Sequence, residues 1–277
     1  MNVENTARHL MKGFIGPLLF LGLCMLSTRI LSDDQKGQAV PPAATTGQAC
    51  ESPAKPRLIS FEQRADIFMA RKSYGDAVDY YYRALKQDNF KNAVVWNKLG
   101  IAYQQLPNYR AARKAYSQAI RLQKNYSEPL NNLGTTYFLQ NKYGKSVKYY
   151  QRAIKLEPNS ASYHMNLGTS YFHMKKSKEF MEEYVKALEL DPNVFTTRSA
   201  FGTTLQARGA DPEYYFYLAK VFAHAGRIQE AVHNLRRALE DGFKDRKRIV
   251  NDPDFMKISQ NPAYVELMNN PPVAIKD

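Results

Sequence analysis

The histidines, which are the commonest metal ligands and proton carriers in proteins, are poorly placed here for either task. His164 and His173 lie nine residues apart on one predicted helix, a spacing that points them to opposite sides of that helix. His224 and His233 fall on two different predicted helices. A catalytic or structural metal needs several ligands that converge on one point. The histidine pattern therefore does not predict a metal site.

The remaining reactive side chains show no catalytic pattern either. The acidic pairs Glu182-Glu183 and Asp33-Asp34 are interpreted as solvated charge. No zinc-protease, serine-hydrolase, nucleotide-loop or paired-carboxylate motif occurs in the sequence. Both cysteines, Cys24 and Cys50, precede the predicted folded part, which leaves no disulfide framework or thiolate site there. We predict that the protein is not an enzyme and needs no cofactor or metal.

The elements that hold these side chains repeat every 34 residues between 93 and 194. The repeated columns are Trp96, Leu130, His164; Leu99, Leu133, Leu167; Gly100, Gly134, Gly168; Tyr103, Tyr137, Tyr171; Tyr116, Tyr150, Tyr184; and Ala119, Ala153, Ala187. Residues four apart, such as Leu99 and Tyr103, share one face of a helix and form a continuous apolar stripe. The glycine and alanine columns are small residues, which are expected to let helix axes approach closely. His164 shares the column of Trp96, which favours core packing.

These columns, with Trp96-x2-Leu99-Gly100-x2-Tyr103 as the best copy, resemble the tetratricopeptide repeat (TPR) superfamily. The resemblance implies an all-α fold, a right-handed TPR superhelix (α-solenoid) of about five helical hairpins. The C-terminal phrases Tyr217-Leu218-Ala219-Lys220 and Asp252-Pro253-Asp254-Phe255 also resemble exported or membrane-anchored bacterial TPR proteins. An N-terminal apolar segment and a flexible linker are expected before the solenoid.

The segment boundaries follow from the repeat register and from Pro and Gly positions. We predict a signal peptide or signal-anchor at 1–31, a disordered linker at 32–57, repeats one to four at 58–92, 93–126, 127–160 and 161–194, a half repeat or loop at 195–211, repeat five at 212–245, and capping helices at 246–270. Asp211-Pro212, Asp252-Pro253 and Asn261-Pro262 are expected helix starts. Repeat four carries Phe180 where a small residue is usual, which predicts looser packing there.

The N-terminal segment contains the one long apolar run, residues 13–31. Its length is close to the roughly 20 residues that span a bilayer, and no convincing cleavage site follows it. We favour an uncleaved signal-anchor over a cleaved signal, with lipidation at Cys24 third. The predicted location is the cell envelope, on the periplasmic or exported side and anchored in the inner membrane. Secretion after cleavage is the alternative.

The formal net charge of the chain is +13, and its interpretation depends on where the basic residues lie. Much of it falls on the second helix of each hairpin, as in Arg110, Arg113, Lys148 and Arg152. In the TPR family this helix forms the outer, convex wall. No nucleic-acid-reading motif accompanies the charge, so a solvated basic face is favoured and no nucleic-acid partner is expected. Contact with anionic lipid heads is the minority interpretation.

The TPR resemblance implies a concave groove, lined by the first helices, that binds a protein or an extended peptide. The candidate groove residues are Asn97, Gln104, Asn131, Thr135, Phe138, Met165, Thr169, Phe172 and His173. Amides would bind a peptide backbone and aromatic rings its side chains; packing of Phe138 and Phe172 against the next repeat is the alternative. The carboxylate clamp of chaperone-binding members is matched only at Asn132 and is not expected.

The sequence therefore predicts a non-enzymatic interaction scaffold in the cell envelope, attached to the membrane through residues 13–31. Its partner would be a protein or peptide held in the concave groove. The alternative is a lipid- or polyanion-binding envelope protein that uses the basic convex face, for which binding would weaken steeply with salt. Self-association into a structural array is a third interpretation.

Overall fold

The computed structural model describes residues 59–195 and 211–274, and every regular element within them is a helix. The first eight helices are α1 (Phe61–Ala70), α2 (Tyr74–Gln87), α3 (Ala93–Gln105), α4 (Tyr109–Leu122), α5 (Ser127–Phe138), α6 (Tyr143–Leu156), α7 (Ala161–His173) and α8 (Ser177–Leu190). They are followed by α10 (Pro212–His224), α11 (Ile228–Glu240), α12 (Arg246–Val250), α13 (Pro253–Met256) and α14 (Pro262–Asn269). The predicted all-α fold is confirmed.

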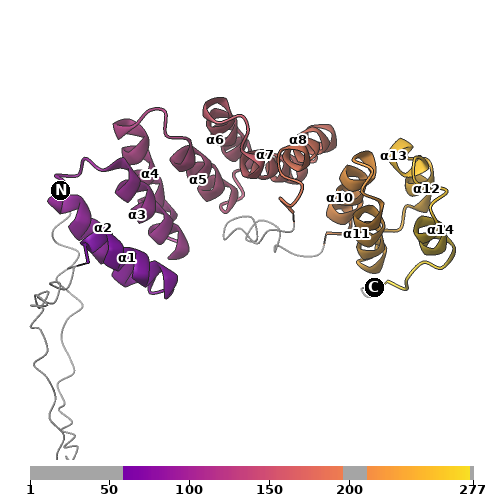
Figure 1. Ribbon diagram of the computed structural model, residues 1–277, viewed down its shortest axis with the longest axis horizontal. Coiled ribbons are helices and arrows are strands. Elements are labelled where there is room, and N and C mark those ends of the chain that lie inside the picture. The colour runs from indigo at the N-terminus through magenta and orange to yellow at the C-terminus, as the bar shows by residue number, and fades with distance from the viewer. Residues whose placement is uncertain (1–58, 196–210, 275–277) are drawn as a thin grey trace, which may run out of the picture. The chain divides into compact units, whose positions relative to one another are not determined.

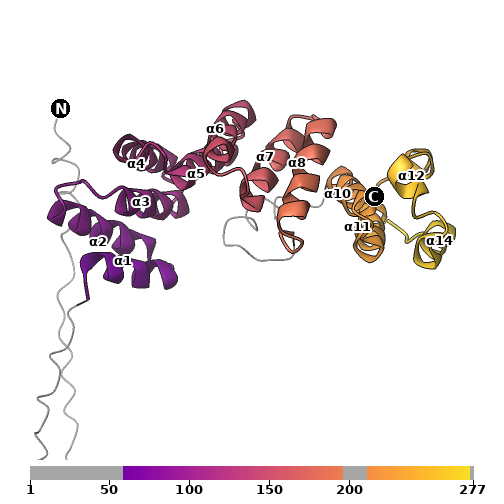
Figure 2. The same cartoon turned by 45° about the horizontal axis from the view of Figure 1, so that its top comes forward.

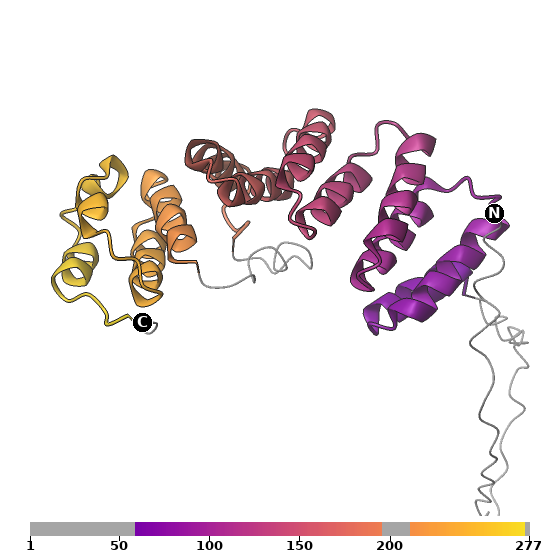
Figure 3. The ribbon, with the colours of Figure 1, turned by 180° about the vertical axis from the view of Figure 1, so that it is seen from behind.

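Consecutive helices pack as hairpins, and consecutive hairpins pack on each other (Figure 1 and Figure 3). The first helices of neighbouring hairpins also touch, α3 with α5 and α5 with α7. Figure 2 shows α4 and α6 on the same side of the row that α3 and α5 form. This is the arrangement of a solenoid, in which each hairpin buries its apolar stripe only against its neighbours.

The glycine column explains how the two helices of a hairpin come close. A Cβ atom built on Gly134 would lie 2.7 Å from the ring of Tyr150, and one on Gly100 would lie 2.4 Å from the ring of Tyr116. Both rings are fully buried. The expected role of this column is therefore confirmed: the tyrosine of the second helix occupies the space that a side chain on the first helix would need.

Phe180 does not loosen the fourth hairpin, so that prediction is wrong. Its side chain is fully buried, and its ring centroid lies 4.1 Å from that of Tyr184 and 5.7 Å from that of Phe172. Tyr214 and Tyr217 of α10 lie within 6.2 Å of it. The large side chain fills the space between α8 and the next hairpin, and α8 and α10 consequently share one apolar core.

The C-terminal helices begin where the sequence predicts. Asp211 Oδ1 accepts a hydrogen bond from the Glu213 amide at 2.9 Å, and Asp252 and Asn261 cap α13 and α14 in the same way, each with proline in the first turn. The short α12, which was not predicted as a separate helix, is capped by Asp245. Helix α13 packs on α10 and α14 packs on α11, so these helices cover the end of the last hairpin.

Two charged contacts join α13 and its N-cap to α10, and a third lies within the α13 segment. Lys220 Nζ lies 2.7 Å from Asp252 Oδ2, His224 Nδ1 lies 3.0 Å from Asp254 Oδ1, and Lys257 Nζ lies 3.1 Å from the same oxygen. Burial acts to raise the pKa of the Asp254 carboxyl, but hydrogen bonds from His224 and Lys257 outweigh it and hold that pKa below its usual range. The charged form of Asp254 is therefore favoured in the folded state.

Acid should weaken this cap. An aspartate with a lowered folded-state pKa stabilises the fold above its unfolded pKa of about 3.9, and that contribution is lost as the pH falls through the folded value. In thermal denaturation, Asp254→Asn should lower Tm at pH 7, and its difference from wild type should shrink below pH 4. The exposed Glu266→Gln serves as the control and should change little at either pH. An equal loss of Tm for Asp254→Asn at both pH values would contradict a lowered pKa for the Asp254 carboxyl.

All described residues belong to one compact unit, Pro56–Asp277, and the core clusters contain only residues of this unit. The fragment 56–277 is thus suited to experiments in solution. The predicted signal-anchor at 13–31, the linker at 32–57 and nearly all of the half repeat at 195–211 lie outside the described residues. Within the described residues, none of the helices combines the length and apolar character needed to cross a bilayer.

Candidate protein-binding surface

All of the predicted groove residues lie on α3, α5 and α7, the first helices of hairpins two to four. Their side chains are mostly enclosed by neighbouring helices. Asn97, Gln104, Asn131, Thr135, Phe138, Met165, Thr169 and Phe172 are buried, and His173 is half-buried. These side chains thus join hairpins to each other, and contact between them and a ligand stays a prediction.

The asparagine amides form a ladder from one hairpin to the next. Asn132 Nδ2 donates to Asn97 Oδ1 at 3.0 Å, and Asn166 Nδ2 donates to Asn131 Oδ1 at 2.9 Å. Within the described residues, Asn166 Oδ1 is buried without a hydrogen-bond partner. Because a buried amide without partners is costly, the ladder favours one register of stacking. Most of these amide groups are therefore already used within the fold.

Buried tyrosine hydroxyls satisfy the other polar groups of this face. Tyr116 Oη donates to Gln104 Oε1 at 3.2 Å, and Tyr150 Oη donates to Thr135 Oγ1 at 3.0 Å. Thr169 Oγ1 lies 2.8 Å from Tyr184 Oη. Burial raises the pKa of the Tyr150 phenol, which consequently keeps its proton. The predicted groove hydroxyls thus hold the second helices in place.

The rings of Phe138 and Phe172 pack against neighbouring helices, as the alternative interpretation predicts. Phe138 lies 5.1 Å from the ring of His173 and 5.3 Å from that of Tyr143. Phe172 lies 5.4 Å from the ring of Tyr214, on the next described hairpin. Phe172 also lines a pocket.

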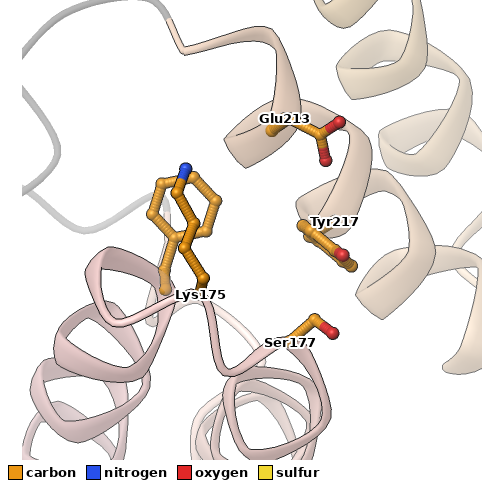
Figure 4. Close-up of a pocket in the computed structure, with 5 residues that line it drawn as sticks. Lys175, Ser177, Glu213 and Tyr217 are labelled. Atoms are coloured by element: carbon orange, nitrogen blue, oxygen red, sulfur yellow. The ribbon is translucent and has the colours of Figure 1, made fainter. Parts of the chain in front are cut away.

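That pocket lies between the α7–α8 turn and the start of α10, with a volume of about 280 Å³. Its lining consists of Phe172, Lys175, Ser177, Glu213 and Tyr217. Figure 4 shows the Lys175 side chain on the opposite side of the pocket from Glu213 and Tyr217. Lys175 Nζ is 5.8 Å from the centroid of that ring. We call these five residues the junction pocket.

The two sides of the junction pocket differ in charge balance. Arg248 Nη1 lies 2.8 Å from Glu213 Oε1, and Arg248 Nη2 donates to Tyr217 Oη at 2.6 Å. The same guanidinium lies 4.4 Å from the Phe216 ring centroid, so the acidic side is neutralised and held in place. Among the described residues, Lys175 forms no ion pair with a carboxylate. The pocket can accept an acidic group beside an apolar side chain.

Sequence reasoning found only Phe172 among the five pocket residues. Lys175 lies in the α7–α8 turn and Ser177 is the first residue of α8, and the family geometry predicts no groove residue at either position. Glu213 and Tyr217 lie four residues apart after the predicted helix start at Asp211, and this spacing is the sequence signal that puts both on one face of a helix. Nothing in the sequence indicated that this face would meet the α7–α8 turn.

The structure also locates the candidate metal ligands. His164 is buried, with Nδ1 2.6 Å from Glu183 Oε2 and Nε2 3.0 Å from the Pro158 carbonyl oxygen. Core packing was the favoured interpretation of His164, and it is confirmed, with two polar partners added. In the part of the chain that the structure describes, no three His, Cys, Asp or Glu side chains are grouped as a metal site.

Comparison with known proteins gives a family for the central hairpins. Models of the tetratricopeptide repeat match residues 127–160 and, in a second version, residues 93–126 and 161–194. No curated protein sequence matches the chain.

Several solved structures are similar in part. A MamA crystal structure shares 22% identity at a TM-score of 0.46, covering 64% of this chain and 92% of that one. MamA 41-end from Desulfovibrio magneticus RS-1 shares 16% identity at a TM-score of 0.47, and the match covers 65% of this chain and 92% of that one. YrrB, described as a TPR protein with an unusual peptide-binding site, shares 17% identity at a TM-score of 0.44, and the match covers 65% of this chain and 83% of that one.

Proposed function

Since this chain belongs to the tetratricopeptide repeat superfamily, with three repeats matched over residues 93–194, we propose that it is a non-enzymatic scaffold that binds a partner protein through an extended segment. One observation carries this proposal. On the first-helix side of the hairpins most polar groups are paired within the fold, whereas the junction pocket combines the Phe172 ring and the Ser177 hydroxyl with Lys175, which forms no ion pair with a carboxylate of the described residues. This is the place where a ligand would gain contacts without breaking existing ones.

The chemistry of the junction pocket defines the expected ligand. The ring of Phe172 offers an apolar surface, Lys175 offers a positive charge, and the Ser177 hydroxyl can bond a peptide backbone group. Extended peptides bind in this way, with main-chain hydrogen bonds for affinity and side-chain pockets for specificity. We expect a segment in which an aromatic or large apolar residue lies next to aspartate or glutamate.

Lys175→Glu should abolish most of this binding. The probe is a fluorescein-labelled peptide of alternating Asp and Phe, compared with its Lys and Phe counterpart by fluorescence polarisation on fragment 56–277. The acidic peptide should bind more tightly, and reversing the Lys175 charge should weaken it by about tenfold or more, since ~1.4 kcal/mol is a factor of ten. Ionic contacts in a partly enclosed pocket reach this size.

The control is Lys178→Glu, the same change on a side chain that is 87% exposed on α8. It should leave the affinity within about twofold, as surface charges usually do. Equal binding by wild type and Lys175→Glu would exclude the junction pocket as the site.

The proposed location is the cell envelope. The apolar run at 13–31 and the Pro-rich segment after it support a membrane-inserted anchor with a tether. A C-terminal reporter that is active only outside the cytoplasm should be active on the full chain. Activity confined to the cytoplasm would contradict this location.

A further inference from the structure

The positive charge of the described hairpins is concentrated on two helices, α4 and α6. Their cations are Arg110, Arg113, Lys114, Arg121, Lys145, Lys148, Arg152 and Lys155. Neither helix contains an aspartate or glutamate. By contrast, α2 balances two acidic with two basic residues, and α8 has four glutamates against two lysines. We call this surface the α4–α6 basic face.

The cations of this face are available to a ligand. Within the described residues none of them lies within 4.0 Å of a carboxylate, whereas both α8 lysines do. Seven are exposed and Arg113 is half-buried. Because α4 and α6 lie on the same side of the hairpin row (Figure 2), their fields add.

Two tyrosines bind the cations of neighbouring hairpins into one cluster. Tyr137 of α5 stacks on Tyr149 of α6, with ring centroids 5.3 Å apart and planes at 12°. Arg113 and Lys145 lie 5.5 and 5.6 Å from the Tyr137 centroid. Arg152 lies 5.3 Å from that of Tyr149. Cations held over rings lose less side-chain freedom when an anion binds.

The same helices expose apolar side chains beside the charge. Leu122 and Leu156, the last residues of α4 and α6, are 40% and 43% exposed. Basic residues with neighbouring exposed leucines are typical of surfaces that lie in a membrane interface. A nucleic acid fits less well, because single strands bind by stacking bases on free aromatic faces, and the Tyr137–Tyr149 stack already uses its rings.

We propose that the α4–α6 basic face is a docking surface for an anionic phospholipid membrane. Lipid phosphates would bind at the cations, and Leu122 and Leu156 would enter the interface. The junction pocket is lined by other helices, so peptide binding there and lipid binding here can fail separately. The proposal does not depend on residues 13–31.

Vesicle sedimentation with fragment 56–277 tests this proposal without the apolar run. The fragment should bind phosphatidylcholine vesicles that contain about one third phosphatidylglycerol, and pure phosphatidylcholine vesicles much more weakly. Added NaCl should release it, because the screening length falls to about 3 Å at 1 M. Equal binding to both vesicle types would overturn the proposal.

Two triple variants assign the surface. In the first, Arg121→Gln, Lys148→Gln and Lys155→Gln change exposed side chains that make no ring contact or ion pair in the described residues, so folding should be unaffected. In the second, Arg113→Gln, Lys145→Gln and Arg152→Gln remove the three cations that lie over the Tyr137 and Tyr149 rings. Each should weaken binding by about 100-fold, at roughly fivefold per cation.

The matched control removes three cations elsewhere, with Lys86→Gln, Lys178→Gln and Lys186→Gln. It should bind within about threefold of wild type, because two of these lysines already face carboxylates. Wild-type affinity in the first triple variant would overturn the proposal. Binding of inorganic polyphosphate without any vesicle binding would overturn it too, and would indicate a soluble polyanion as the ligand.

Discussion

Phe180→Ala should lower the free energy of unfolding by about 3–5 kcal/mol, the usual cost of truncating a fully buried phenylalanine. The repeat pattern predicts the opposite change in stability, because three other hairpins have alanine at the equivalent position: Ala77, Ala112 and Ala231. A consensus argument would predict a gain. The structure predicts a loss, because Phe180 is fully buried and lies among rings of α7, α8 and α10.

Urea denaturation of fragment 56–277 measures this effect. The loss of helix is monitored by the circular dichroism signal at 222 nm. Leu156→Ala is the control, because this leucine is 43% exposed and surface truncations usually change stability by about 0.5 kcal/mol or less. If Phe180→Ala were neutral or stabilising, α10 would not dock on α8 through this cluster.

Gly134→Val should cost about 3 kcal/mol or more, the upper range for overpacking. The new Cβ would lie 2.7 Å from the Tyr150 ring. That ring is fully buried, and its hydroxyl donates to Thr135 at 3.0 Å, so it has no room to move aside. The two helices of the third hairpin would have to separate.

The same substitution at Gly144 separates overpacking from helix propensity. A Cβ there would meet nothing within 4 Å, and valine is slightly better than glycine inside a helix, by about 0.3–0.5 kcal/mol. Gly144→Val should therefore leave the unfolding midpoint unchanged or raise it slightly. Comparable losses at both glycines would contradict the proposed role of the glycine–tyrosine contact.

The hairpins were predictable because the same contact recurs in the three central copies. Gly100 with Tyr116 and Gly134 with Tyr150 repeat one local packing solution, and the periodic spacing displays it. The helix starts at Asp211, Asp252 and Asn261 were predictable for a similar reason, since capping needs only a side-chain acceptor and the residues that follow it.

The binding surface was less predictable because it depends on what covers each side chain. Family geometry places Asn131 and Phe138 on the inner side of α5, but it does not give the extent of burial by α7, which supplies Asn166 and His173. The junction pocket joins Lys175 to Glu213 across 38 residues of sequence. That pairing depends on tertiary packing of α8 and α10, which no local pattern specifies.

The central claim is that a partner's extended segment binds at the junction pocket. Hydrogen–deuterium exchange of fragment 56–277, with and without the acidic Asp and Phe peptide, tests it most directly. The account predicts slower exchange that is concentrated at residues 172–177 and 213–217 and is absent in Lys175→Glu. Slower exchange that maps instead to α4 and α6, or that persists in Lys175→Glu, would contradict it.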